Sequence, residues 1–378
     1  MNRNETEGQK PTLIELDRSL IGASLEPAFA EGVSGLFAGV LGEWLIFGGG
    51  CNFPSSNPSQ KVYYSSLYAM RQRAGGSYET ISLAALQAPI GYGASLLSDQ
   101  GNILYLVGGT DGSEARREIY EVTLQAGKPM VRLSEVQLPH GWYEGSAALI
   151  EDNLYLVGGW KGLGTPHDTV TRVSLKSGAS ETLEELPEGS RIQPVAFAHN
   201  GFIYLFGGFR PAQGAVPPHM HRRAYRLDPS QQGAKWEVIA ENPQLENGRK
   251  LLFVGSSVVR DPVTLKVYMA GGVDYDVFEQ ALNREYAEAK AHQAGDTDAI
   301  RDFEQARKAY LSMPEESYHF LPYLLRFSPE ANRWEVVTQD TAYATAGAAL
   351  AVGKDATYLV GGERKPRVRT PDIWRTPL

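Results

Sequence analysis

The sequence is poor in cysteine: Cys51 is the only one in 378 residues. A single thiol excludes an intrachain disulfide and a metal cluster held by several thiolates. Long apolar runs are also missing, since no stretch reaches the roughly 18 apolar residues that a membrane-spanning helix needs. The first residues, Met1 to Pro11, are polar and charged and do not resemble a secretory signal. Together these absences favour a cytoplasmic protein without a membrane partner.

Basic residues do not predominate. Lys and Arg number 36 against 44 Asp and Glu, a net charge of −8, which disfavours nucleic acid or an anionic membrane as a partner. Phosphate-binding loops, the dinucleotide glycine fingerprint and the nucleophile elbow are absent. His219 and His221 lack a third ligand at a recognisable spacing, so we expect neither a metal ion nor a cofactor.

Glycine is plentiful and recurs in doublets, each of which ends a short apolar strand. The first glycines of the six doublets are Gly48, Gly108, Gly158, Gly207, Gly271 and Gly361. Their spacings of 60, 50, 49, 64 and 90 residues lie near the roughly 50 residues of a kelch blade. Apolar strands of this kind suit burial between stacked blades. The repeats therefore predict an all-β, six-bladed kelch-type β-propeller, one domain over residues 1–378, with residues 1–10 flexible.

Two places depart from the repeat. The 90-residue spacing contains a helical pattern over residues 276–312, interrupted at Gly295, which predicts a helical hairpin inserted in the fifth blade and standing over one rim. The sixth blade has room for only one strand after its doublet and so lacks an outer strand. A strand within residues 12–21 is expected to supply it and close the ring.

The loops behind all six doublets are expected to open onto one face of the propeller. Among them Glu363 stands out because Arg364, Lys365, Arg367 and Arg369 surround it. Burial would raise the pKa of this carboxyl and the cations would lower it, so it is a candidate general base. A surface cluster of ion pairs is the plainer interpretation of the same residues.

Five segments match those of a known family: Ala270-Gly271-Gly272-Val273, the helical insert, Leu324-Leu325-Arg326-Phe327-Ser328-Pro329, Thr345-Ala346-Gly347-Ala348-Ala349 and the run from Gly362 to Thr370. They resemble bacterial N-acetylneuraminate epimerases, the sialic acid mutarotases. The order of the blades is rotated relative to that family, because the blade that begins this chain lies behind the glutamate blade there. The sequence is thus most similar to the cyclically permuted mutarotases.

The resemblance implies roles for five residues. Glu363 matches the proposed proton acceptor, Arg369 is expected at the substrate carboxylate, and Lys365 lies in the same motif. Arg191 and Gln193 form a second match that is expected to bind substrate from the channel wall. The implied activity is interconversion of the α and β anomers of N-acetylneuraminate or a related sugar acid by acid/base ring opening and closing, without a cofactor.

Two alternatives remain at this stage. A non-enzymatic kelch propeller would bind a protein or glycan on its rim, and exposed aromatic residues would matter more than Glu363. A copper radical oxidase on a kelch scaffold is disfavoured, because Cys51 has no visible cluster of tyrosine and histidine ligands. The sequence leaves the oligomeric state and the identity of the sugar open.

Overall fold

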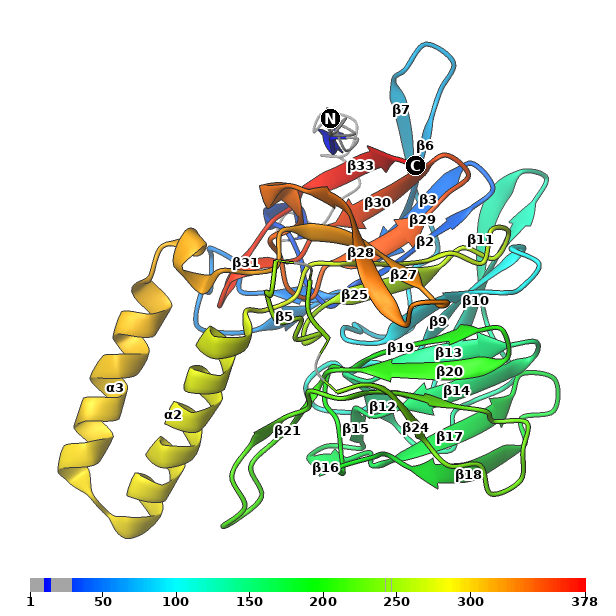
Figure 1. Cartoon of the computed structure of the whole chain (residues 1–378). Helices are drawn as coiled ribbons and strands as arrows, with labels where there is room; N and C mark the ends of the chain where they lie inside the picture. The colour runs from blue at the N-terminus through cyan, green and yellow to red at the C-terminus, as the bar shows by residue number, and fades with distance from the viewer. Residues whose placement is uncertain (1–9, 15–28, 242, 246) are drawn as a thin grey trace, which may run out of the picture.

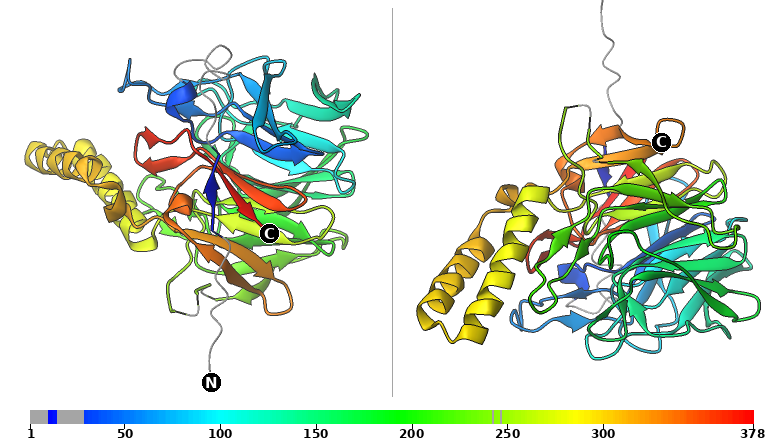
Figure 2. Two further views of the ribbon diagram at one scale, coloured as in Figure 1. Left: turned by 90° about the horizontal axis from the view of Figure 1, so that it is seen from above. Right: turned by 60° about the horizontal axis from the view of Figure 1, so that its bottom comes forward.

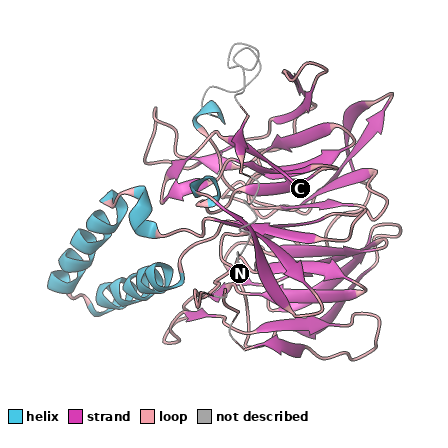
Figure 3. Cartoon of the chain, turned by 45° about the horizontal axis from the view of Figure 1, so that its top comes forward, coloured by secondary structure: helices cyan, strands magenta, loops and turns pink. Residues whose placement is uncertain are grey.

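A computed structural model describes residues 10–14, 29–241, 243–245 and 247–378. Most of the segment expected to be flexible, residues 1–9, lies outside them. The described part is built mainly of β-strands, and its two α-helices stand together at one side (Figures 1 and 3).

Six four-stranded antiparallel sheets follow one another along the described part of the chain. The first comprises β2 (Phe37–Leu41), β3 (Trp44–Gly48), β6 (Leu67–Gln72) and β7 (Tyr78–Ser82), and the second β8 (Ala94–Leu97), β9 (Ile103–Val107), β10 (Ile119–Gln125) and β11 (Lys128–Leu133). The third comprises β13 (Ser146–Ile150), β14 (Asn153–Val157), β17 (Thr169–Ser174) and β18 (Ser180–Glu185), and the fourth β19 (Val195–His199), β20 (Phe202–Phe206), β23 (Ala224–Leu227) and β24 (Glu237–Ala240). The fifth comprises β25 (Ser257–Arg260), β26 (Val267–Ala270), β27 (Tyr323–Ser328) and β28 (Arg333–Gln339), and the sixth β29 (Ala349–Val352), β30 (Ala356–Val360), β33 (Ile373–Pro377) and β1 (Thr12–Leu13).

The first strands of the six sheets surround a common axis. Around this ring β2 contacts β8, β8 contacts β13, β13 contacts β19, β19 contacts β25, β25 contacts β29, and β29 contacts β2. All six strands line one central cavity of about 260 Å³. The arrangement is that of a β-propeller with its cavity on the axis.

The glycine doublets end the second strand of each sheet, where the chain must pass close to the neighbouring sheet. Gly361 and Gly362 have φ angles of 61° and 109°. A Cβ atom on Gly361 would lie 2.5 Å from the carbonyl oxygen of Val33, closer than two such atoms can approach. Glycine is therefore required at position 361, two residues before Glu363.

The start of the chain completes the sixth sheet. Thr12 and Leu13 pair with Arg375 and Trp374 of β33, and the backbone N–H of Ile14 donates to the carbonyl of Ile373 at 2.9 Å. The predicted pairing of the N-terminal strand with the last sheet is therefore observed for residues 12–14, whereas residues 15–21 of the predicted range lie outside the described residues.

Helices α2 (Tyr275–Ala294) and α3 (Thr297–Ser312) lie between β26 and β27, which are neighbours in the fifth sheet. Asp274 caps α2 with its side chain, and Gly295, at φ 69°, ends it. Figures 1 and 2 show the pair projecting from the propeller. No residue of α3 is buried; this helix packs on α2, and its Tyr310 contacts Tyr318, which lies just after the hairpin. Neither described helix is long and apolar enough to cross a membrane.

Most of the remaining short strands lie in the connections between the second and third strands of the larger sheets. The strands are β4 (Cys51–Asn52), β5 (Val62–Tyr63), β12 (Trp142–Tyr143), β15 (Trp160–Lys161), β16 (Thr165–Pro166), β21 (Phe209–Arg210), β22 (His219–Met220), β31 (Glu363–Lys365) and β32 (Val368–Arg369). The single turns of 3-10 helix are η1 (Phe29–Glu31), η2 (Glu315–Tyr318) and η3 (Thr341–Tyr343). Several of these pairs lie together at the end of the propeller from which the helices project (Figure 1).

Candidate active site at the channel mouth

The hairpin of β31 and β32 brings Glu363 and Arg369 together as cross-strand partners. Arg369 Nη1 lies 3.1 Å from Glu363 Oε2, and the backbone N–H of Arg367 donates to Oε1 at 2.9 Å. The backbone of Glu363 forms two hydrogen bonds with Ala346, at 2.7 and 2.9 Å, which fix it beside the entrance to β29. Glu363 thus lines the central cavity.

The environment of Glu363 favours proton exchange. Burial raises the pKa of its carboxyl above the ordinary value of 4.5, and Arg369, the Arg367 N–H and Lys61 offset only part of that rise. A carboxyl with a raised pKa can take up and return a proton closer to neutral pH than an exposed glutamate can.

Arg369 is buried and has a side-chain N–H donor without a partner among the described residues. Its side chain is 4% exposed, and its guanidinium carbon lies 5.3 Å from the centre of the Phe53 ring. Its Nε is buried and has no hydrogen-bond partner among the described residues. A guanidinium fork held in this way is suited to bind a carboxylate through two parallel hydrogen bonds.

Residues with left-handed backbone precede each of the six inner strands and encircle the cavity. They are Gly35 (φ 64°), Tyr92 (62°), Glu144 (51°), Gln193 (51°), Gly255 (67°) and Gly347 (63°). Backbone N–H groups link most neighbours in this mouth ring: Tyr92 donates to Gly35, Glu144 to Tyr92, Gln193 to Glu144, Gly35 to Gly347 and Gly347 to Gly255, at 2.7–2.9 Å. A non-glycine residue in this conformation costs about 1–2 kcal/mol, and such strain clusters at functional sites.

The mouth ring has two unlike halves. Tyr92, Glu144 and Gln193 are consecutive around it and carry side chains, whereas the other three positions are glycine. Glu363 is attached to the glycine half through Ala346, the residue before Gly347. The glycine half therefore leaves space in front of Glu363, and the polar side chains border that space.

Glu144 is a second carboxylate at the cavity. Its Oε2 accepts a hydrogen bond from Trp160 Nε1 at 2.9 Å. Burial raises the pKa of Glu144 above 4.5, while Trp160, Lys61 and the Gln193 side chain partly offset the rise. No ion pair of Glu144 is found among the described residues, in contrast to Glu363 with Arg369.

Lys61 and Tyr92 complete the polar wall. Lys61 Nζ and Cys51 Sγ each donate to the hydroxyl oxygen of Tyr92 at 3.3 Å. Sequence reasoning missed Glu144, Tyr92 and Lys61. One signal was available for the first two: each precedes an inner strand at a position where other repeats have glycine.

Two residues predicted to bind substrate lie away from the cavity. Arg191 is fully buried, and its guanidinium donates to the carbonyls of Gly207 and Pro187 at 2.9 and 3.3 Å. Burial lowers its pKa to about 10. Lys365 donates from Nζ to the carbonyl of Met313 at 2.9 Å, at the end of the helical hairpin. Of the predicted residues, Gln193 and Glu363 line the cavity. Arg191, Lys365 and Arg369 do not, although Arg369 contacts Glu363.

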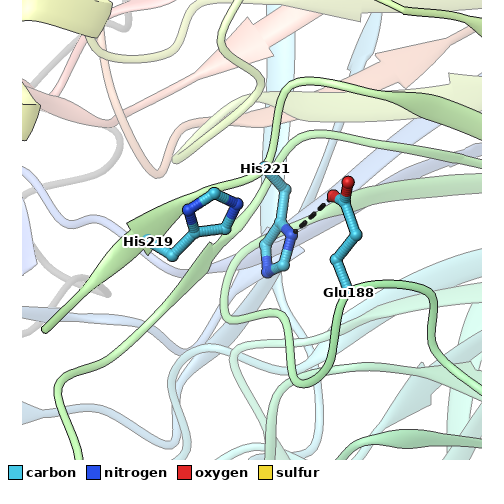
Figure 4. A group of neighbouring side chains, drawn as sticks. All are labelled: Glu188, His219 and His221. Carbon is cyan, nitrogen blue, oxygen red and sulfur yellow. Dashed lines mark hydrogen bonds and ion pairs between the residues drawn. The ribbon is translucent and has the colours of Figure 1, made fainter. Parts of the chain in front are cut away.

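His219 and His221 do meet a third ligand group. Potential ligand atoms of Glu188, His219 and His221 lie within 4.8 Å of one another, and His221 Nδ1 is 3.3 Å from Glu188 Oε2 (Figure 4). The same carboxylate lies 3.6 Å from Arg191 and 3.4 Å from Arg223, and burial with the charge of Arg191 lowers the pKa of His221 to about 2. Two guanidinium groups compete with a cation there, so the cluster suits a loop anchor better than a metal site.

The family model and the similar relatives point to the same protein family. A family model described as N-acetylneuraminate epimerase matches residues 136–378, more than half of the chain. The N-acetylneuraminate epimerase of Haemophilus influenzae (strain PittEE) is 31% identical over 237 residues, which cover 62% of this chain and 57% of that protein. The protein of the same name from Pasteurella multocida (strain Pm70) is 29% identical over 238 residues, covering 62% and 56%. The match thus spans less than two thirds of these relatives.

A solved structure supports the fold. The chain is similar to one described as "Structure of YjhT", with a TM-score of 0.50 and 23% identity over 63% of this chain and 64% of that one. The family match includes Gln193, Glu144 and the whole β31–β32 hairpin with Glu363 and Arg369. The chain therefore belongs to the N-acetylneuraminate epimerase family.

Proposed function

We propose that this protein is a mutarotase that interconverts the α and β anomers of N-acetylneuraminate or a related sugar acid. The observation that carries the proposal is Glu363, which lines the cavity as a proton-exchanging carboxylate and is paired with Arg369, a buried guanidinium with free donors. The names of the relatives support the substrate class.

We also propose a specific architecture for the chain. Six sheets of four strands, each ending its second strand in a glycine doublet, support a single-domain, six-bladed kelch-type propeller with the helical hairpin as an insert in the fifth blade. The family match begins only at residue 136. A cyclic permutation accounts for this, because the blades that begin this chain would lie at the other end of the relatives.

The chemistry requires proton transfer alone. To open the ring, a base removes the proton of the anomeric hydroxyl, the bond from the anomeric carbon to the ring oxygen breaks, and the ring oxygen is protonated. Rotation of the resulting carbonyl and closure on its other face give the other anomer. Glu363 takes the hydroxyl proton and delivers it to the ring oxygen, and closure reverses these transfers, so the carboxylate is unchanged after each cycle.

The remaining residues have distinct parts. Arg369 binds the sugar carboxylate and orients the anomeric carbon, and Gln193 provides a hydrogen bond from the opposite wall. Arg191 and Lys365, although they belong to the matched motifs, hold loops: the first anchors the chain before β19, and the second joins the β31–β32 hairpin to the helical insert.

Anomerisation rates over a panel of sugars test the proposal. The protein should accelerate equilibration of freshly released α-N-acetylneuraminate, measured by proton NMR, and should leave neutral sugars such as glucose near their spontaneous rate because they lack a carboxylate. A propeller that only binds a protein or glycan on its rim would give affinity without acceleration for every sugar.

A further inference from the structure

The site holds a second carboxylate that the chemistry above does not use. Ring opening moves two protons at two different atoms, the anomeric hydroxyl and the ring oxygen. One carboxylate can serve both only in sequence, by carrying the same proton from one oxygen to the other. Two carboxyl groups on opposite sides of the sugar can act in one step.

The ring of inner strands places Glu144 opposite Glu363. Glu144 directly precedes the third sheet's inner strand, β13, and Glu363 is attached beside the sixth sheet's inner strand, β29. In either direction around the ring, two inner strands lie between β13 and β29: β8 and β2 on one side, and β19 and β25 on the other. Both residues line the same cavity, so a ligand on the axis would have a carboxyl group on each side.

The backbone of Glu144 gives independent support. At the equivalent position Gly35, Gly255 and Gly347 adopt the left-handed conformation without strain, whereas Glu144 adopts it at φ 51°. Glycine would fit this position better, and its backbone hydrogen bonds to Tyr92 and Gln193 do not depend on the side chain. The backbone conformation at position 144 therefore favours glycine, and the presence of a glutamate there indicates a role for its side chain.

Two side chains at the mouth hold the carboxyl of Glu144. Trp160 Nε1 donates to Oε2, and the Gln193 side chain also hydrogen-bonds the carboxyl. The charged or titratable groups that act on Glu144 from neighbouring elements are Lys61, Tyr63, Tyr92 and Tyr143. Only Lys61 is a cation among these, and it acts on Glu363 as well. The two carboxyls thus differ in that Glu363 alone has an arginine partner.

We infer that Glu144 is the second catalytic residue of this site, donating its proton to the ring oxygen while Glu363 removes the proton of the anomeric hydroxyl. The inference rests on the proposed function. In the opening step the electron pair of the breaking carbon–oxygen bond goes to the ring oxygen, which takes the proton of Glu144, and the anomeric oxygen becomes a carbonyl oxygen. On closure at the other face, the hydroxyl formed from the ring oxygen returns its proton to Glu144 and Glu363 gives its proton to the carbonyl oxygen, so protons and electrons balance over the cycle.

The pH dependence of kcat/KM tests this assignment. The wild type should give a bell-shaped profile, with an acid limb because Glu363 must be ionised and an alkaline limb because Glu144 must be protonated. Glu144→Gln should lower the rate by about 10²- to 10⁴-fold and remove the alkaline limb. Trp160→Phe deletes the hydrogen bond that lowers the pKa of Glu144, so its alkaline limb should move to higher pH.

A glycine variant separates chemistry from folding. Glu144→Gly should be inactive yet melt at or above the wild-type temperature, because it relieves the left-handed strain. Glu151 is the matched control: it is a glutamate with φ 54° in the turn between β13 and β14, at the other end of the same strand. Glu151→Gly should relieve similar strain and keep full activity.

Each outcome decides a different question. If the wild type accelerates anomer exchange and Glu144→Gln keeps its alkaline limb, the inference is wrong and the proposed function stands; Tyr92, the other proton donor at the mouth, would then be the acid. If the wild type gives no acceleration on any sugar acid, the proposed function fails and the inference with it. Loss of both rate and alkaline limb in Glu144→Gln supports the inference.

Discussion

At the scale of single residues, the site depends on one arginine that is buried without being fully bonded. Arg369 contacts Glu363 and the Phe53 ring and keeps a free Nε. An unpaired buried donor costs free energy in the empty protein, and a bound carboxylate would recover it. This accounts for an arginine rather than a lysine at this position.

Arg369→Lys should therefore lower kcat/KM by about 10- to 100-fold, mainly through KM, because the charge is kept and the two parallel hydrogen bonds are lost. Arg364 offers a matched control on the same hairpin, since its guanidinium donates to the Thr341 carbonyl at 2.8 Å and forms no ion pair with Glu363 among the described residues. Arg364→Lys should change little. Equal losses in the two variants would contradict the role of Arg369.

The raised pKa of Glu144 should also make the stability of the folded protein depend on pH. Because burial holds its pKa above the ordinary 4.5, the folded protein binds this proton more tightly than the unfolded chain does. The stabilisation is complete below the unfolded pKa and is lost as pH rises through the folded pKa. The melting temperature of Glu144→Gln relative to wild type should thus be higher near pH 8 than near pH 4. A difference that does not change with pH would contradict the pKa shift.

At the scale of elements, the sequence predicted strands and helices better than it predicted which way their side chains face. Residues two apart share a face only in a regular strand. At Gln193 the φ of 51° turns the chain, so Arg191 faces the protein interior while Gln193 faces the cavity. Between Glu363 and Lys365 the pairing register shifts, and Lys365 reaches the helical insert instead. Neither irregularity is readable from residue types.

Strand β1 offers a test at this scale. Ile14, which directly follows β1 and is 5% exposed, packs in one cluster with Val33, which precedes the first sheet, and with Ile373 of the last sheet, whereas Leu13 is 39% exposed. Ile14→Ala should lower the free energy of unfolding by about 2–4 kcal/mol, because it leaves a cavity where the chain closes on itself. Leu13→Ala should cost less than about 0.5 kcal/mol. Denaturant unfolding measures both, and equal effects would show that this strand does not hold the closure.

At the scale of the whole molecule, repetition made the fold readable from sequence. Six doublets behind apolar strands indicated a ring, and a ring places six equivalent loops at one mouth. The charged hairpin of Glu363 could be located on that basis. The mouth ring of left-handed residues could not, because the sign of φ at Tyr92, Glu144 and Gln193 follows from how neighbouring sheets meet rather than from their residue types.

The central claim is that Glu363 transfers the proton that opens the sugar ring. The most direct measurement is the rate of exchange between the anomers of N-acetylneuraminate, followed by one-dimensional proton NMR with wild-type protein and with Glu363→Gln. The account predicts acceleration by the wild type, a loss of about 10²- to 10⁴-fold in the variant, and sugar binding retained by both. Equal acceleration by the two proteins would contradict it.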